Sequence, residues 1–176
     1  MNNRPIILEL TEELSNLISA GEVVERPVSI VKELVENSLD ANATSIKIEL
    51  YEGGLNKIIV SDNGIGMTKN EIPIALKRHA TSKIKSSTDL FNISTLGFRG
   101  EALPSIASVS KMSISSSTNE LDGIKMIFQG GKLISSQDIS MTIGTKIEVE
   151  DLFYNTPARL KHLASSYSEL SNVIAS

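Results

Sequence analysis

The hydrophobic and polar residues of PVSIVKELVENSLD, positions 27–40, recur with the spacing of an amphipathic α-helix. Pro27 suits the first turn of such a helix, where its missing N–H leaves no hydrogen bond unmade. The apolar residues gather on one stripe, with Leu34 at its edge: Val28, Val31, Val35 and Leu39. The pattern therefore predicts a helix that is anchored along this stripe.

The polar side of the same helix carries Glu33, Asn37 and Asp40, which stack on the side opposite the stripe. Such a side is most simply a solvated face, as on other amphipathic helices. Asn37 fits that interpretation less well, because asparagine forms helices poorly where Lys or Glu would serve better. The helix alone leaves a solvated face and a functional face both open.

Other elements follow from the same kind of pattern. Thr11 is expected to cap a short helix that ends at Ala20–Gly21. Residues 45–51 and 57–61 flank a Gly53–Gly54 turn and predict a β-hairpin, in which Ile48 and its alternate neighbours Ile46 and Leu50 face inward. From residue 112 the period changes to two, which predicts strands over 112–117, 123–129, 132–135 and 146–149. Residues 6–8 are expected to be extended, and short helices are expected over 70–78, 101–108, 157–164 and 167–175.

The order of these elements predicts an α+β sandwich, with one mostly antiparallel sheet and its helices packed on one face. Between the third and fourth helices lies a long polar segment, His79–Thr95, rich in Ser, Thr and Lys. A segment of this length inside a compact domain usually forms a functional lid or a disordered loop.

Composition narrows the picture. The 176 residues suffice for one sizeable domain or part of a larger one, and the low aromatic content (4%) predicts a core of Ile, Leu and Val. A net charge of −4 gives no overall footprint for nucleic acid, although a local basic patch stays open. The absence of cysteine excludes disulfides and thiolate metal sites. With no leader-like start and no membrane-length apolar run, we expect a cytoplasmic protein with no membrane contact.

The second predicted strand runs into Asp62-Asn-Gly-Ile-Gly66. A carboxylate at this place could accept a hydrogen bond from an exocyclic amine, and Gly64 and Gly66 would let the backbone pass close to a flat ring. A plain Asn-Gly turn explains the same residues about equally well.

Further along, Gly97 and Gly100 come directly before a predicted helix. Free N–H groups at such a place can cradle phosphate oxygens, although a hinge would use the same glycines. A Walker phosphate loop is absent from the sequence. Thr81, Ser82 and Lys83 could approach phosphates or belong to a solvated loop. The only two histidines, at positions 79 and 162, are interpreted as structural or surface residues.

In combination, these motifs resemble the four ordered motifs of the GHKL ATPases: Glu33-x3-Asn37-x2-Asp40, Asp62-x-Gly-x-Gly66, a segment ending Gly97-x-x-Gly100, and Gly144-Thr145. Within that superfamily, which includes DNA gyrase, large heat-shock chaperones and sensor histidine kinases, four stretches look like MutL-type mismatch repair signatures. These stretches are residues 18–41, 78–84 (RHATSKI), 96–103 (LGFRGEAL) and 151–159 (DLFYNTPAR).

The resemblance implies a Bergerat-type GHKL sandwich with a mostly antiparallel mixed sheet. It also implies that Glu33 is the general base of a magnesium-dependent ATPase, that Asn37 is the Mg²⁺ ligand, and that Asp62 reads adenine with support from Thr145. The residues that the resemblance places at ATP are Asn37, Asp40, Ala41, Asp62, Gly64, Gly66, Met67, Thr81, Ser82, Lys83, Leu96, Gly97, Phe98, Arg99, Gly100, Glu101 and Thr145.

At the level of the whole protein, the resemblance implies that residues 1–176 are a truncated ATP-binding domain without the second domain and the C-terminal dimerisation region. ATP and Mg²⁺ would close the lid and pair two such domains in a homodimer, and hydrolysis would reopen them. The expected partners are a MutS-type mismatch recognition protein and DNA, the latter mainly through regions outside these residues. The isolated chain would turn over ATP weakly or act only as a nucleotide-binding module. A histidine kinase is the weaker alternative, because LGFRGEAL and the lack of a phosphoacceptor helix oppose it.

Overall fold

One antiparallel sheet organises the computed structural model, which describes residues 9–77, 101–163, 171 and 173–174. In these residues the sheet has six strands, in the order β1-β2-β6-β3-β4-β5, and every described pairing is antiparallel. The strands are β1 (Ile46–Tyr51), β2 (Lys57–Asp62), β3 (Lys111–Asn119), β4 (Asp122–Gln129), β5 (Lys132–Ile139) and β6 (Gly144–Glu150).

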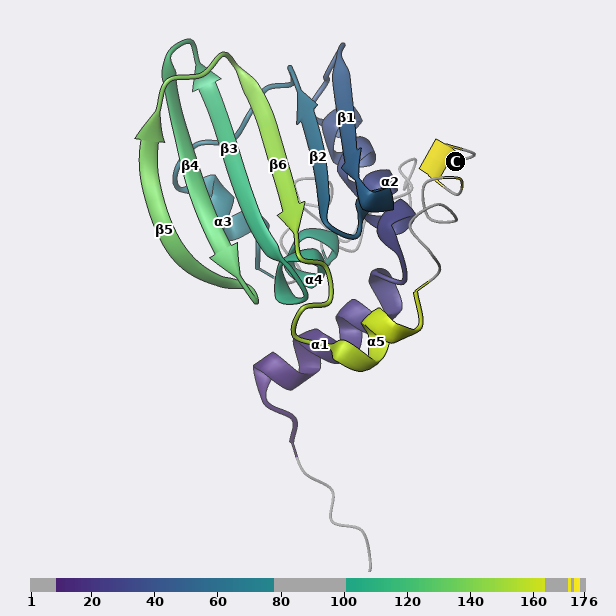
Figure 1. The fold of residues 1–176 in the computed structure, drawn as a ribbon. Helices are drawn as coiled ribbons and strands as arrows, with labels where there is room; N and C mark the ends of the chain where they lie inside the picture. Colours follow the sequence, from purple (N-terminus) through teal and green to yellow (C-terminus); the bar gives the residue numbers. More distant parts are fainter. Residues whose placement is uncertain (1–8, 78–100, 164–170, 172, 175–176) are drawn as a thin grey trace, which may run out of the picture.

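Helices cover one face of this sheet. In Figure 1, α2, α3 and α4 lie behind the strands, and α1 and α5 lie below their lower end. The helices are α1 (Glu12–Val23), α2 (Pro27–Asp40), α3 (Glu71–Ala75), α4 (Ala102–Ser108) and α5 (Pro157–Lys161), with a short 3-10 turn, η1 (Glu52–Gly54), between β1 and β2. The predicted α+β sandwich with helices on one face is therefore confirmed.

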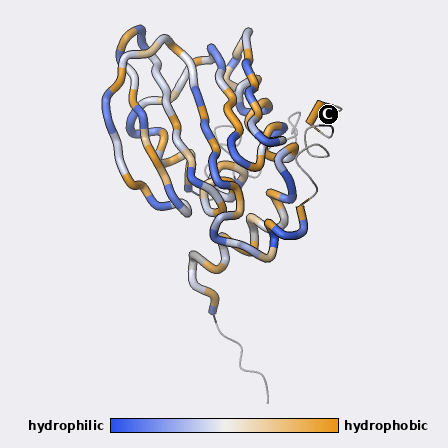
Figure 2. Tube along the Cα trace, in the orientation of Figure 1, coloured by the Kyte–Doolittle hydropathy of each residue, from blue (hydrophilic) through white to orange (hydrophobic). Residues whose placement is uncertain are grey.

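The core lies between the covered face and the helices. Alternate residues of the four central strands project into it, so that hydrophobic and hydrophilic positions alternate along the strands in Figure 2. Ile58 of β2, Ile114 of β3 and Val149 of β6 are fully buried and belong to one cluster with Leu34 of α2 and Ile106 of α4.

The elements follow the sequence pattern closely, with differences at their ends. The predicted bounds of α2 are confirmed, and the side chain of Thr11 caps α1 by accepting from the N–H of Leu14 at 3.3 Å. Helix α1 continues past Gly21 to Val23, because hydrogen bonding persists to the N–H of Val24. The helices predicted over 70–78 and 157–164 are shorter, at Glu71–Ala75 and Pro157–Lys161, and β5 is longer, at Lys132–Ile139.

Two predictions of orientation were wrong. Ile48 is 42% exposed, because β1 is the edge strand of the sheet. On α2, Val31 is buried as predicted, but Leu39 is 59% exposed and the buried side is completed by Ile30 and Ser38. The polar residues of α2 therefore lie beside the buried face and not opposite it.

Some predictions fall outside the described residues. These are the extended segment 6–8, the lid segment 79–95 and most of the helix predicted over 167–175. Among the described residues, no helix is both long and apolar enough to cross a membrane.

Candidate functional site

A polar row crosses the end of the sheet on the face that the helices cover. Asp62 of β2 is the register partner of Thr145 of β6, which in turn pairs with Ser116 of β3. Register partners of an antiparallel pair project on the same face, so the three side chains stand side by side. The next row inward, Val60–Ile147–Ile114, is apolar and buried. Along each of these three strands, the apolar core row and the polar row are thus only two residues apart.

The carboxylate of Asp62 is held from two directions. The hydroxyl of Ser38, on the buried side of α2, donates to Oδ2 at 2.8 Å, and the N–H of Gly64 donates to Oδ1 at 2.9 Å. Each carboxylate oxygen can accept more than one hydrogen bond, so both keep capacity for a ligand. The carboxylate is half-buried, fixed in orientation and still able to accept.

The loop after Asp62 is wedged between the end of α2 and the sheet. The N–H of Ile65 donates to the carbonyl of Ala41 at 2.9 Å, and a Cβ on Gly64 would lie 2.7 Å from that of Ala41. Gly66 has φ +70°, and a Cβ there would collide with the carbonyl oxygen of Ser117. Both glycines are thus required by the packing of the loop against its own chain.

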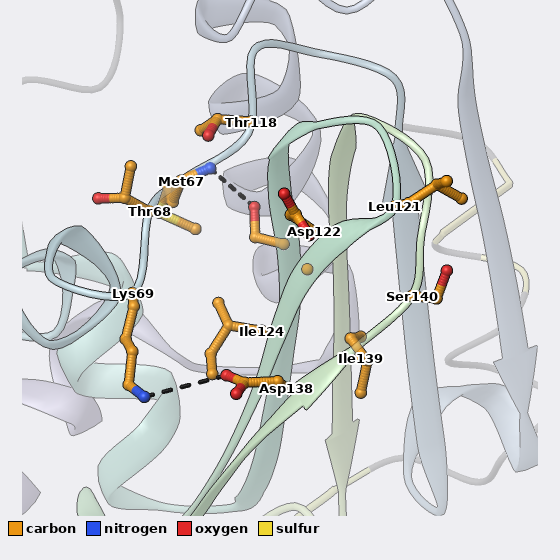
Figure 3. Close-up of a pocket in the computed structure, with 12 residues that line it drawn as sticks. Met67, Thr68, Lys69, Thr118, Leu121, Asp122, Ile124, Asp138, Ile139 and Ser140 are labelled. Atoms are coloured by element: carbon orange, nitrogen blue, oxygen red, sulfur yellow. Dashed lines mark hydrogen bonds and ion pairs between the residues drawn. The ribbon is translucent and has the colours of Figure 1, made fainter.

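Ser116 connects this loop to the start of β6. Its hydroxyl accepts from the N–H of Met67 at 2.8 Å, a bond drawn in Figure 3, and lies 2.9 Å from the hydroxyl of Thr145 and 3.0 Å from the carbonyl of Gly144. Because Ser116 is completely buried, these polar contacts are shielded from water. They fix Met67 and Thr145 relative to each other.

The polar residues that were predicted to act at the site lie on the middle and last turns of α2. Glu33 and Asn37 are half-buried and Asp40 is exposed. Because Ser38 contacts Asp62 and Ala41 contacts Gly64, the last turns of α2 are pressed against the polar row. The side-chain amide of Asn37 forms no hydrogen bond with any residue that the structure describes.

The structure places part of the predicted set. It brings together Ala41, Asp62, Gly64, Gly66, Met67 and Thr145, with Asn37 and Asp40 on the adjoining helix. Glu101 stands at the N-cap position of α4. The remaining predicted residues lie outside the described part: Thr81, Ser82, Lys83, Leu96, Gly97, Phe98, Arg99 and Gly100.

Two residues of the cluster, Ser38 and Ser116, were missed by the sequence interpretation. Each has a signal in the sequence, since each is a polar residue at a position where the pattern calls for an apolar one. Ser38 follows Ile30 and Leu34 on the buried side of α2, and Ser116 follows Met112 and Ile114 in the alternation of β3.

A pocket of about 550 Å³ lies next to the row, between the segment Met67–Lys69 and the ends of β3, β4 and β5 (Figure 3). Lys69 and Asp138 face each other across it, with 3.9 Å between Nζ and Oδ1. Of the predicted ATP-binding residues that the structure describes, Met67 alone lines this pocket. The pocket therefore adjoins the Asp62 cluster and shares Met67 and Ser116 with it, but Asp62 and Thr145 do not line it.

Comparison with known proteins gives consistent results. A family profile described as "Histidine kinase-, DNA gyrase B-, and HSP90-like ATPase" matches residues 25–156. The chain is 55% identical over 169 residues to DNA mismatch repair protein MutL of Streptococcus equi subsp. zooepidemicus and 56% identical over 171 residues to that of Streptococcus thermophilus. These matches cover 96% and 97% of the chain but only 26% of each relative, so the chain spans about a quarter of their length.

Solved structures share the fold. The N-terminal domain of a DNA repair protein superposes with a TM-score of 0.76 and 32% identity, over 90% of this chain and 46% of the other. The Aquifex aeolicus MutL ATPase domain complexed with ADP gives 0.67 and 34% identity, over 87% and 53%. Together with the antiparallel sheet, this likeness confirms the predicted GHKL fold. The chain belongs to the family of histidine kinase-, DNA gyrase B- and HSP90-like ATPases, on its MutL branch.

Proposed function

We propose that this chain binds ATP with Mg²⁺ at the Asp62–Thr145 end of the sheet and hydrolyses it as the ATPase domain of a MutL-type mismatch repair protein. The observation that carries the proposal is the fixed carboxylate of Asp62, held by Ser38 and Gly64 with acceptor capacity to spare. The MutL ATPase domain that was solved with ADP has the same fold, which supports nucleotide binding by this chain.

Asp62 is assigned to the adenine amine. Its carboxylate can accept from the exocyclic amine, whereas guanine presents a carbonyl at the same place and would leave two acceptors facing each other. Such a mismatch costs on the order of 1–3 kcal/mol. ATP should therefore outcompete GTP for the purified protein, and equal competition by the two nucleotides would refute this assignment.

The residues of α2 fit a magnesium ion carried by the nucleotide. Among the described residues no cluster of three or more His, Cys, Asp or Glu side chains could hold a metal by itself. Mg²⁺ commonly binds through one or two protein oxygens together with phosphate oxygens and waters, and the side-chain oxygen of Asn37 suits that role. When bound, the ion supplies charge neutralisation at the phosphates.

Glu33 is assigned as the general base. It lies one turn before Asn37 on α2, about 40° from it around the helix axis, whereas Glu36 lies about 60° from Glu33. A carboxylate one turn from the metal ligand can accept the proton of a water aligned with the γ-phosphorus. Leu96–Glu101, with glycines just before α4, is assigned to cover the phosphates, together with Thr81, Ser82 and Lys83.

In the whole protein, we assign residues 1–176 to the ATP-binding domain. ATP binding would close the lid and pair two of these domains in a homodimer, and hydrolysis would reopen them. This switch would couple a MutS-type mismatch recognition protein to downstream repair on DNA. The support for these roles is the likeness to MutL proteins over 26% of their length.

The decisive experiment separates binding from hydrolysis in the full-length protein. A general base contributes about 10²–10⁴-fold to the rate but little to ground-state binding. Glu33→Ala should therefore retain ATP affinity in calorimetry and lose phosphate release, and Asn37→Ala should lose magnesium-dependent binding. Glu36→Ala is the matched control: Glu36 lies three residues after Glu33 on the same helix, and this variant should hydrolyse ATP normally. Hydrolysis near wild type in Glu33→Ala would place the base elsewhere, and absence of ATP binding to the wild type would end the proposal.

A further inference from the structure

The β1–β2 hairpin and the loop after it hold α2 near both of its ends. In Figure 1, this helix lies behind the two strands. On its last turns, the hydroxyl of Ser38 donates to Asp62 at the end of β2, at 2.8 Å. On its first turn, buried Pro27 lies next to Gly54 in the turn between β1 and β2. The helix is therefore braced between two contacts with the same hairpin.

The contact at the first turn depends on the absence of a side chain at position 54. Gly54 has φ +87°, and a Cβ there would lie 2.8 Å from the Cβ of Pro27 and 3.2 Å from Cγ1 of Ile58. Because ordinary contacts of a Cβ begin at 3.4 Å, the gap to Pro27 would have to widen by about 0.6 Å. Gly54 thus permits both a left-handed backbone and a close approach of α2.

The surroundings of Gly54 show which side would yield to an added side chain. Ile58 is fully buried, and its strand β2 is paired with β1 on one side and β6 on the other. The start of α2 is held less firmly, because Glu25 and Arg26 before it are exposed and Arg26 makes no side-chain capping bond. A methyl group at position 54 would therefore displace the first turn of α2 and leave the sheet in place.

A helix that is pushed at one end and held at the other tilts. Glu33 lies about midway between Pro27 and Ser38. A shift of about 0.6 Å at Pro27 would therefore move Glu33 by about half as much, since each helical residue advances by the same rise. Asn37 is adjacent to Ser38 and would hardly move. The tilt thus changes the placement of Glu33 relative to Asn37.

We propose that Gly54 is a positioning residue for ATP hydrolysis, which sets the tilt of α2 and thereby the orientation of Glu33. The inference rests on the proposed function and deepens it. Gly54 acts through the helix and is not assigned to the nucleotide. Because a general base contributes to the rate and little to ground-state binding, a misplaced Glu33 should lower kcat and spare affinity.

The test measures phosphate release and ADP affinity of Gly54→Ala in the full-length protein with Mg²⁺. A misplacement of about 1 Å can cost about 10²-fold in rate, so a shift about a third as large should lower kcat about fivefold. The dissociation constant of ADP in calorimetry should stay within about twofold of wild type. An unchanged kcat in the folded variant, or an equal loss of ADP affinity, would overturn the inference.

The matched control is Gly131→Ala, in the turn between β4 and β5. Gly131 has a similar φ of +81°, but a Cβ there would lie 3.8 Å from its nearest neighbour, the Cα of Ser108. The variant therefore has the same kind of backbone strain without a collision, and it should keep the wild-type kcat. An equal fall of kcat in Gly131→Ala would assign the effect to backbone strain and overturn the role of Gly54.

A rescue experiment isolates the contact with the helix. Adding Pro27→Gly to Gly54→Ala removes the Cβ that the new methyl group meets, and should return kcat to within about twofold of wild type. Adding Pro27→Ala instead keeps that Cβ and should not restore kcat. Restoration by both substitutions, or by neither, would contradict the proposed contact.

Two further outcomes are distinguishable. If Gly54→Ala does not fold by circular dichroism, Gly54→Asn brings a Cβ to the same place with less backbone strain, and the same fall of kcat is expected. If the wild type neither binds ADP nor hydrolyses ATP, the proposed function itself fails. Wild-type activity together with an unchanged kcat in the folded Gly54 variants would remove only the positioning role.

Discussion

The hydroxyl of Ser38 shows how much a single residue on the buried side of a helix decides. Its neighbours on that side, Ile30 and Leu34, are fully buried in the core, whereas Ser38 reaches out of the core to the carboxylate of Asp62 at 2.8 Å. The buried side of α2 therefore has two roles: it packs against the core, and it orients the carboxylate of Asp62.

Replacing Ser38 tests this role. Hydrogen bonds to charged groups contribute about 1.5–3 kcal/mol, so Ser38→Ala should weaken ADP binding by about tenfold, measured by calorimetry. The melting temperature should also fall, because the same hydrogen bond stabilises the fold, although the high helix propensity of alanine offsets part of the loss. Ser29→Ala, on the same helix but away from Asp62, serves as control and should bind ADP normally. Wild-type affinity in Ser38→Ala would show that Gly64 alone suffices to orient the carboxylate.

Single residues also mark where sequence interpretation succeeds and where it stops. Asp62 and Gly66 stand out because a strand ends in a turn motif, and the structure places both in the cluster. The reason for Gly66 lies in a contact with Ser117, which is about fifty positions away, and no local pattern contains that contact. Ser116 is hidden for a similar reason, because its three partners come from two other segments.

At the scale of elements, α2 illustrates the same limit. Its ends were predicted because Pro27 and the helical period are local signals. The rotation of α2 about its axis was not predicted correctly. Two apolar stripes lie side by side on this helix, and the helical period alone does not show which of them is buried. The sheet and α4 choose the stripe with Ile30 and Leu34, which turns Leu39 out to solvent.

The end of α1 is held by an element far along the chain. Nη2 of Arg159, in α5, donates to the carbonyls of Gly21 at 2.8 Å and Val24 at 3.0 Å, and its guanidinium stacks 4.8 Å from the ring centre of buried Phe153. Carbonyls at the end of a helix lack partners in the helix and carry partial negative charge, so a cation satisfies both needs.

Removing the guanidinium of Arg159 should destabilise the connection between α1 and α2. Arg159→Met keeps most of the apolar stem but loses both hydrogen bonds, and should lower the free energy of unfolding by about 2–3 kcal/mol. Arg159→Lys should recover only part of it, since an ammonium cannot stack and fork in the same way. Urea denaturation measures both variants against Lys161→Met, an exposed neighbour on α5. Equal stability of Arg159→Met and the control would contradict the anchoring role.

At the scale of the whole molecule, the face of the sheet without helices is stabilised by charge. The carboxylate of Glu148 in β6 accepts from Lys57 at 3.1 Å, Lys146 at 3.1 Å and Ser113 at 3.0 Å, which joins β2, β6 and β3. Burial alone would raise the pKa of Glu148, but the hydrogen bonds from Lys57, Lys146 and Ser113 outweigh it and lower the pKa to about 2.

This depressed pKa makes stability depend on acid. Because the ordinary pKa of glutamate is 4.5, the contribution of Glu148 is fully present above that pH and is lost as the pH falls toward 2. Glu148→Gln should reduce the free energy of unfolding at pH 7 by about 1–2 kcal/mol, less than the full shift implies because water screens the lysines. The difference from wild type should vanish in urea titrations near pH 2.

A matched control comes from β1. Lys47 and Glu49 form an ion pair at 3.0 Å on the same face, and Lys47 is exposed to solvent, so Glu49→Gln should cost less than about 0.5 kcal/mol at any pH. If the difference between Glu148→Gln and wild type persists unchanged at low pH, the carboxylate is not the source of the stability.

The position of β6 has a consequence for how the chain reaches its fold. β6 is the last described strand along the chain, yet it lies between β2 and β3 and joins the β1–β2 hairpin to the β3–β4–β5 meander. Until it inserts, the two pieces present open edges that can pair with other chains. Contacts so distant in sequence raise the contact order and slow folding. Because β6 also brings Thr145 to Asp62, the polar row is completed only when the sheet closes. A nascent chain that ends before β6 therefore has neither a continuous sheet nor a complete polar row.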